Sequence, residues 1–252
     1  MGGIDPLGVR YKAAESAMRA VLDQDGLFGI RLDGKAFHNF TKQYARPYDT
    51  RFMDVMDATA IGIIEKSLTG VHFAYVQSDE ITIFFSRSNV KAALPYGGKV
   101  EKLLSICAAT ATGVFMKAQP DCDGIPVFDA RLFALTDAAD LAGYLDWRRL
   151  DARKNAITMA ASTLASHKQL HGVTTKERAA LLAGTDLETL PEGFFNGRLI
   201  VRQTYTDVVE VPVKGGGTRE QEVTRFTWVS VPALRETADA MAAAVTPVVA
   251  TA

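Results

Sequence analysis

The stretch HFAYVQSDEITIFF, residues 72–85, decides the expected fold of this chain. Its two ends, His72–Val76 and Ile81–Phe85, are rich in β-branched and aromatic residues, which favour strands. Only the polar segment Gln77–Glu80 separates them. The stretch therefore predicts a β-hairpin whose polar tip carries two adjacent acids.

Upstream of this hairpin, the pattern predicts a strand and then a helix. The apolar run Leu27–Leu32 ends in Asp33-Gly34, which is typical of a strand followed by a turn. After a helix cap at Asp49 or Thr50, apolar residues recur at helical spacing as far as Ile63.

Downstream, a helix and a strand complete the order. Gly97-Gly98 precedes a helix whose apolar side runs from Val100 to Phe115, and Val127–Leu135 returns to a strand. The predicted order is strand, helix, strand, strand, helix, strand, which is the split βαβ, ferredoxin-like arrangement. The expected fold class is α+β, a ferredoxin-like βαββαβ palm with additional C-terminal helices and a β-hairpin.

The rest of the chain is predicted to extend this core rather than form a second domain. We expect one domain over residues 1–252, with a palm core at about 25–136 and an extension of helices and a hairpin at about 137–252. The extension is expected to begin with a long helix over 138–165, which could break at Gly143, and a short helix over 175–183. Two strands follow, over 197–202 and 223–231, with the glycines 215–217 in a long flexible loop between them. A frayed helix is expected from Ala238.

Composition excludes several classes of protein. Of the 252 residues, 48% are hydrophobic and 23% charged, which is ordinary for a globular domain with a sizeable core. No apolar run approaches the roughly 20 residues that span a bilayer, and the N-terminus lacks a signal pattern, so a cytoplasmic protein without a membrane partner is expected. Cys107 and Cys122 form no CxxC pair, so neither structural zinc nor a disulfide framework is predicted. The net charge of −1 means that any RNA contact comes from local patches or oligomeric grooves.

The predicted topology brings acidic residues together. In a right-handed βαβ unit the first two strands are parallel, so Asp33 and Asp79 follow strand ends at one edge of the sheet, with Glu80 beside them. Carboxylates in this arrangement suit Mg²⁺, which prefers oxygen ligands, and two such ions can stabilise the attacking and leaving oxygens of an in-line displacement. Gly34 fits because the absence of a Cβ allows close approach of backbone to metal and triphosphate.

Structural alternatives remain open for each of these patterns. Asp-Gly after a strand is a common turn, and an Asp-Glu hairpin tip is usually a solvated loop. Lys99 and Lys102 lie one helical turn apart and could face one anion or simply form a solvated helix edge. Asp129 and Arg131 share a strand face and could pair with each other.

Several ordered motifs between about Leu7 and Arg202 resemble the tRNA-His guanylyltransferase (Thg1) family, and most of all its Thg1-like relatives, the 3′–5′ polymerases. The spacing of the motifs makes the resemblance specific. The motifs are Arg31-Leu32-Asp33-Gly34-Lys35-Ala36-Phe37-His38-Asn39-Phe40, Ala45-Arg46-Pro47-Tyr48-Asp49, Ala74-Tyr75-Val76-Gln77-Ser78-Asp79-Glu80, Phe128-Asp129-Ala130-Arg131 and Tyr144-Leu145-Asp146-Trp147-Arg148.

The resemblance implies roles for particular residues. Asp33, Asp79 and Glu80 correspond to the catalytic acids, and Asp33, Asp79 and the carbonyl of Gly34 to the ligands of two Mg²⁺ ions. The role of Glu80, as ligand or as orienter, stays open. The implied nucleotide-binding set is Asp33, Gly34, Lys35, Ala36, Phe37, His38, Arg46, Ser78, Asp79, Lys99, Lys102 and Asn155, in which Lys35 to His38 act through backbone amides.

The resemblance also implies a reaction, substrates and partners. GTP and ATP are the implied substrates, and tRNA is the implied partner of a homotetramer. An RNA 5′-monophosphate would be activated by ATP or GTP and then attacked by the 3′-hydroxyl of an incoming nucleotide.

The sequence departs from the guanine-adding members of the family just after Trp147-Arg148. Those members carry a His-Ile-Asn-Asn motif there, whereas Arg153 takes the histidine position here and only Asn155 survives. A permanent cation cannot accept a hydrogen bond, so reading of a base at this position should change. This departure favours template-dependent repair of tRNA 5′ ends over guanylyltransferase activity proper.

Two other functions use the same strand order. A non-catalytic RNA-binding module would stack bases on aromatic residues of its central strands, but Ile81–Phe85 lacks the signature of RNA-recognition motifs. A nucleotide cyclase on the same palm would convert GTP without an RNA acceptor.

Overall fold

The computed structural model describes residues 6–87, 93–213 and 216–245. Its centre is one six-stranded sheet in the order β4-β1-β3-β2-β5-β6, with every neighbouring pair antiparallel. The first four strands have the 4-1-3-2 order of the predicted ferredoxin-like palm, so the fold class is confirmed. The strands are β1 (Leu27–Gly34), β2 (Val71–Gln77), β3 (Glu80–Ser86), β4 (Phe128–Leu135), β5 (Arg198–Pro212) and β6 (Thr218–Pro232).

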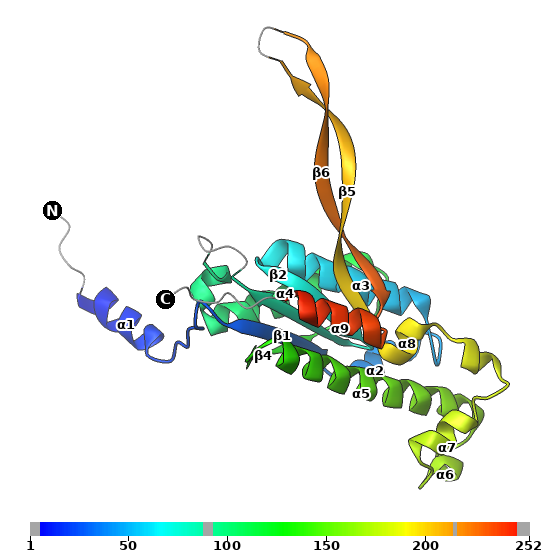
Figure 1. Cartoon of the computed structure of the whole chain (residues 1–252). Coiled ribbons are helices and arrows are strands. Elements are labelled where there is room, and N and C mark those ends of the chain that lie inside the picture. The colour runs from blue at the N-terminus through cyan, green and yellow to red at the C-terminus, as the bar shows by residue number, and fades with distance from the viewer. Residues whose placement is uncertain (1–5, 88–92, 214–215, 246–252) are drawn as a thin grey trace.

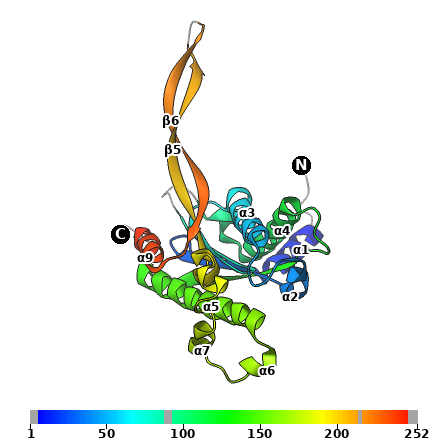
Figure 2. The ribbon, with the colours of Figure 1, turned by 90° about the vertical axis from the view of Figure 1, so that its right-hand side faces the viewer.

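Helices cover both faces of the palm sheet (Figures 1 and 2). On one face, α3 (Thr50–Ser67) and α4 (Val100–Ala118) pack against the buried even-numbered residues of β1, such as Ile30 and Leu32. On the other face, α5 (Ala138–Leu164) and α9 (Arg235–Ala244) close a second core that includes Phe84. Side chains alternate across a strand, so one sheet supplies both cores.

Shorter elements surround this framework. Helix α1 (Pro6–Ser16), which the sequence pattern did not predict, precedes β1 and buries none of its residues. The remaining helices are α2 (Phe37–Phe40), α6 (His167–Leu170), α7 (Thr175–Ala180) and α8 (Glu192–Asn196), with 3₁₀ turns at Thr41–Gln43, Pro95–Gly98 and Asp186–Thr189. Within the described residues, no helix combines the length and the apolar character that crossing a membrane requires.

The extension differs from expectation in two places. Helix α5 runs without a break through Gly143, because an exposed glycine costs a packed helix only about 1 kcal/mol. Strands β5 and β6 each have 15 residues, far more than predicted, and their outer parts project from the sheet as a two-stranded arm (Figure 1). The expected long glycine loop is therefore wrong; it is a short connection, of which residues 214 and 215 lie outside the described ranges. The helix expected from Ala238 is α9.

A buried ion pair anchors the base of this arm to the palm. Arg198, the first residue of β5, donates from Nε to both carboxylate oxygens of Asp57 on α3 at 2.8 Å. Ser230 of β6 donates to the same carboxylate at 2.6 Å. Asp57 and Arg198 are only 8% and 7% exposed, so their charges depend on each other for compensation.

Candidate active site

The ends of β1 and β2 bring Asp33 and Asp79 to the same edge of the sheet, as the strand order predicted. Both strands pair antiparallel with β3, which runs back between them, so β1 and β2 point the same way. The amide of Gly34 donates to the carbonyl of Asp79 at 3.2 Å, which ties the end of β1 directly to the hairpin tip.

The hairpin tip is a tight turn at Ser78 and Asp79. Ser78 has a φ of 45°, a left-handed conformation that is uncommon for a residue with a Cβ. Burial raises the pKa of the Asp79 carboxyl, and the nearby charge of Asp33 raises it further, against a hydrogen bond from Ser78 that lowers it. Two carboxylates that repel each other at one edge form a place where a cation would be stabilised.

A backbone hydrogen bond and contacts with the core hold the segment after β1 in place. Lys35 donates its amide to the carbonyl of Val127 at 2.8 Å, and Ala36 has a φ of 57°. Phe37 is only 2% exposed and its ring packs against that of Phe128, with centroids 5.0 Å apart. A Cβ on Gly34 would come within 2.4 Å of the Phe37 ring, so glycine is needed here for packing as well.

Helix α2 starts directly after this segment, next to the acidic edge. The first amides of a helix have no partner within it, and α2 begins at Phe37. His38 is exposed beside them. The left-handed residues Ala36 and Ser78 therefore flank the acidic edge on both sides, and such strained positions cluster at functional sites.

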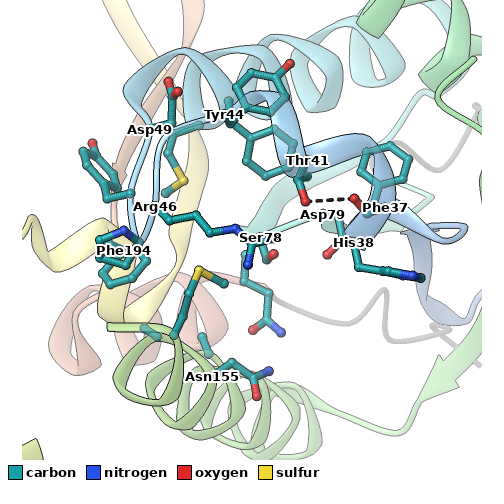
Figure 3. Close-up of a pocket in the computed structure, with 18 of the residues that line it drawn as sticks. Phe37, His38, Thr41, Tyr44, Arg46, Asp49, Ser78, Asp79, Asn155 and Phe194 are labelled. Carbon is teal, nitrogen blue, oxygen red and sulfur yellow. Dashed lines mark hydrogen bonds between the residues drawn. The ribbon is translucent and has the colours of Figure 1, made fainter. Parts of the chain in front are cut away.

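A cavity of about 470 Å³ opens beside the acidic edge (Figure 3). It lies between the hairpin tip, the loop before α3 and the middle of α5, and the side chain of Arg46 extends across it toward Ser78. Of the predicted residues, it gathers Phe37, His38, Arg46, Ser78, Asp79, Glu80 and Asn155. Asp33, Gly34, Lys35 and Ala36 adjoin this cavity through the chain but do not line it.

Glu80 is held by arginines on the α5 side of the sheet. Its carboxylate lies 3.0 Å from Nη2 of Arg148, a residue only 4% exposed, and 4.0 Å from Nε of Arg31. Burial raises the pKa of Glu80, while the charges of Arg148 and Arg31 lower it. These contacts favour Glu80 as an orienting residue over Glu80 as a metal ligand, the two roles that the sequence left open.

The same arginine also joins the hairpin to α5. Arg148 donates to Asp151 at 2.9 Å, and Asn155 donates to the same carboxylate at 3.3 Å. Gln77, in the amide orientation that satisfies both of its ends, accepts from Arg148 Nη2 at 2.7 Å. A continuous polar chain therefore connects Glu80 to Asn155 in the cavity.

The structure does not bring Lys99 and Lys102 to this edge. Helix α4 begins near the start of β1, where Val21 forms a bridge with Lys99. It ends near the end of β1, where the ring of Phe115 packs on Phe37. The reason is topological: β3 runs away from the acidic edge, so the helix after it starts at the opposite end of the sheet. Within one chain these lysines are therefore remote from the cavity.

The pairing of Asp129 and Arg131, one of the alternatives that the sequence left open, is present. Arg131 Nη2 donates to Asp129 at 3.2 Å and lies 4.0 Å from an oxygen of Asp33. The pair is a contact within the sheet surface that also adjoins the acidic edge.

Asp33 and Asp79 fit a divalent cation that also takes oxygens from elsewhere. Within the described residues, no group of three or more His, Cys, Asp or Glu side chains is placed to hold a metal ion. Mg²⁺ typically uses one or two carboxylates together with substrate phosphates. Two carboxylates and a backbone carbonyl are therefore enough ligands for the protein to supply.

Sequence reasoning missed several residues of the site. Tyr48 and Phe194 form one wall, with ring centroids 5.7 Å apart, although they are distant in sequence. Met53 and Met159 line the cavity as well. No motif marks Phe194 or the methionines, whereas Arg148 lay in a recognised motif and could have been sought as the partner of a half-buried acid.

A ferredoxin-like palm with two carboxylates at one sheet edge and a cavity beside them suits a nucleotidyltransferase. A family model for the tRNAHis guanylyltransferase, Thg1, matches residues 9–136. The chain belongs to this family.

Individual proteins are similar over longer stretches. An uncharacterised protein of Acanthamoeba polyphaga mimivirus is 30% identical over 180 residues, which is 61% of each chain. The tRNA(His) guanylyltransferase of Saccharomyces cerevisiae is 27% identical over 196 residues, 69% of this chain and 81% of the yeast protein. The chain therefore spans less than two thirds of the length of the mimivirus relative.

Solved structures show the same fold. A bacterial Thg1-like protein in complex with ATP superposes with a TM-score of 0.73 and 30% identity, covering 77% of this chain and 88% of that one. A second bacterial Thg1-like structure, at 24% identity, has a TM-score of 0.71 over 94% of this chain. The palm and its C-terminal extension thus occur together in relatives.

Proposed function

We propose that this protein is a Mg²⁺-dependent nucleotidyltransferase that adds nucleotides to tRNA 5′ ends in the 3′–5′ direction, as template-dependent repair. The observation that carries the proposal is the meeting of Asp33 and Asp79 beside a cavity containing Ser78, Arg46 and Asn155. The similar bacterial protein solved in complex with ATP supports ATP as a substrate. The guanylyltransferase family supports GTP as a second substrate.

Asp33, Asp79 and the carbonyl of Gly34 would hold two Mg²⁺ ions. When bound, such ions neutralise charge that develops on the phosphoryl oxygens during in-line displacement. The repulsion from Asp33, which adds to burial in raising the pKa of Asp79, would be relieved at the same time.

The residues of the chain itself mainly position the reactants. The guanidinium of Arg46 reaches across the cavity and can pair with a triphosphate, while the hydroxyl of Ser78 and the amides from Ala36 to His38 can donate to its oxygens. Asn155 stands on α5 across from them, where it can bind a nucleoside.

The proposed reaction consists of two successive phosphoryl transfers. In the first, an oxygen of the RNA 5′-phosphate attacks the α-phosphorus of ATP, and pyrophosphate leaves. In the second, the 3′-hydroxyl of the incoming nucleoside triphosphate loses its proton and attacks the RNA 5′ phosphorus, and AMP leaves. Neither transfer needs a side-chain nucleophile, so the cavity has to supply only orientation and charge.

The arrangement of the sheet argues against a passive RNA-binding module. Such modules stack bases on exposed aromatic rings of the central strands. Here Phe84 and Phe85 of the central strand β3 are fully buried, because helices cover both faces of the sheet.

The experiment combines the protein with a 5′-truncated tRNA, labelled GTP, ATP and Mg²⁺, with excess chelator as control. Extension of the RNA by labelled nucleotides that requires Mg²⁺ supports the proposal. A cyclic nucleotide as product would instead support the cyclase, and RNA binding without turnover would support the binding module.

A further inference from the structure

Positive charge is concentrated in one segment of the chain. Beyond the ion-paired Arg148 and Arg149, residues 152–178 contain five Lys and Arg residues against one Glu, a net charge of +4. The whole chain has a net charge of −1, so the remainder carries −5. The segment comprises the second half of α5, α6 and the start of α7, with α6 and α7 lying beyond the body of the sheet (Figure 2). A local basic patch on an otherwise acidic chain attracts a polyanion such as RNA.

A second cavity, of about 490 Å³, lies within this segment. Hydrogen-bond donors dominate its polar lining: the hydroxyl of Thr158, the imidazoles of His167 and His171, and the guanidinium of Arg178. The hydroxyl of Ser162 also lines the cavity, but it donates to the carbonyl of Thr158. No carboxylate is among its lining residues in the described part of the chain. The chemistry of this lining suits a phosphate group, which offers only acceptors to a protein.

Arg178 is the fixed charge of this cavity. It donates to the carbonyls of Val173 at 3.1 Å and Leu170 at 3.0 Å, and to the hydroxyl of Thr158 at 3.2 Å. All three partners are neutral, and among the described residues Arg178 forms no ion pair. The guanidinium has five N–H donors, so two remain after these bonds. A half-buried cation held in place without a carboxylate favours binding of an anion.

The second cavity continues the first along α5. Thr158 lines both, and Asn155 in the first is seven residues from Ser162 in the second, about 10 Å along a helix. This separation corresponds to a few nucleotides of an RNA strand. We propose that the cavity between α5, α6 and α7 binds a backbone phosphate of the RNA acceptor, a few nucleotides from the 5′ end held at the acidic edge. The inference rests on the proposed function, since it presumes an RNA acceptor.

The test compares two substitutions that differ only in charge. Ser162 is exposed, and its hydroxyl bonds only to the carbonyl of Thr158. Ser162→Asp places a negative charge in the cavity, whereas Ser162→Asn is the neutral match. Equilibrium binding of a 5′-truncated tRNA is measured without nucleotide over a range of salt concentrations, and GTP binding is measured separately.

We expect Ser162→Asp to raise the Kd for RNA roughly tenfold, the scale of losing one charged hydrogen-bond contact. The slope of log affinity against log salt should fall by about 0.7–0.9, the contribution of one phosphate. Ser162→Asn should stay near wild type, and the Kd for GTP should change in neither variant. The double variant His167→Gln/His171→Gln, which changes two exposed side chains, should weaken RNA binding in the same direction.

An unchanged RNA Kd in Ser162→Asp, or an equal loss in both Ser162 variants, would overturn the proposal. A loss of GTP affinity instead of RNA affinity would also overturn it, because the cavity would then take a free nucleotide. If wild type binds the tRNA but never extends it, the proposed function fails while the comparison of Ser162 variants still decides the fate of this phosphate site.

Discussion

The electrostatics of Asp79 illustrate how a functional residue opposes stability. Burial and the charge of Asp33 both raise the pKa of its carboxyl, so the ionised form is disfavoured in the folded protein when no cation is bound. The folded state therefore binds this proton more tightly than the unfolded state, and its stability falls as pH rises from the unfolded value through the folded one. A side chain that is kept at this cost is expected to serve chemistry.

We predict that Asp79→Asn lowers nucleotide transfer by at least about a hundredfold, because it removes a metal ligand worth several kcal/mol of charge stabilisation. In chelator at neutral pH, its melting temperature should equal or exceed that of wild type. This gain should vanish below the unfolded pKa of Asp79, where the wild-type carboxyl is protonated in both states. Thermal melts across pH and single-turnover assays measure the two effects. Near wild-type turnover would show that Asp79 holds no metal.

Arg148 contacts the same hairpin from the α5 side of the sheet. It contacts Glu80, Asp151 and Gln77 from a position only 4% exposed. We predict that Arg148→Ala lowers the free energy of unfolding by about 3 kcal/mol, since it leaves the half-buried Glu80 without its partner. Urea unfolding measures this loss. Adding Glu80→Gln should recover part of it, whereas simple additivity of the two changes would show that the pair is not coupled.

At the scale of elements, the palm was predictable because its patterns are local and its order is restrictive. The buried strands and the cap at Asp49, which accepts from the Arg51 amide at 2.9 Å, follow from short sequence signals. The strand order also determined that Asp33 and Asp79 meet. The same order placed the start of α4, and so Lys99, at the far end of the sheet, a consequence that the sequence interpretation did not draw.

The rest of the site depends on packing between distant segments. Phe194 reaches the cavity through α8, and no periodicity or motif in the sequence relates it to Tyr48. The arm was underestimated because none of its outer residues is buried, and a strand without a buried face is only weakly marked by alternation in the sequence. Glycines at its end then favoured a long loop.

The pairing of Asp57 with Arg198 is the main polar link between the arm and the palm. We predict that Asp57→Ala lowers the free energy of unfolding by about 3–5 kcal/mol, because it leaves the arginine buried and uncompensated. The matched control is Asp54→Ala, which changes an exposed acid one turn earlier on α3 and should stay within about 0.5 kcal/mol of wild type. Equal effects of the two substitutions in chemical denaturation would contradict the anchor.

At the scale of the whole molecule, the arm is longer than one chain can stabilise. An isolated two-stranded ribbon is marginal in water. The outer part of this one exposes Tyr205, Val208 and Phe226 by 47%, 55% and 46%. These side chains favour contact with further copies of the chain, in line with the homotetramer that the family resemblance implies.

We predict that the protein sediments as a tetramer and that Phe226→Glu shifts it to smaller species. The control Thr224→Glu adds the same charge to an exposed polar position on the same face of the arm, and it should leave the assembly intact. Analytical ultracentrifugation distinguishes these outcomes. A wild-type protein that remains monomeric at micromolar concentration would contradict the prediction.

Arg153 and Lys154 are exposed on α5 beside Asn155. The guanidinium carbon of Arg153 lies over the ring of Phe195, 5.9 Å from the ring centroid. Exposed cations contact phosphates without regard to sequence, whereas reading of an anticodon base needs a donor and an acceptor in fixed positions. We therefore expect addition opposite a template base at any truncated tRNA 5′ end.

The measurement compares extension of a 5′-truncated tRNA that is not tRNA-His with extension of intact tRNA-His. Changing the template base opposite the added position should change the nucleotide that is added, because pairing selects it. Changing the anticodon should have no effect on either RNA. Strong preference for intact tRNA-His together with dependence on its anticodon would contradict the repair function and identify guanylyltransferase activity proper instead.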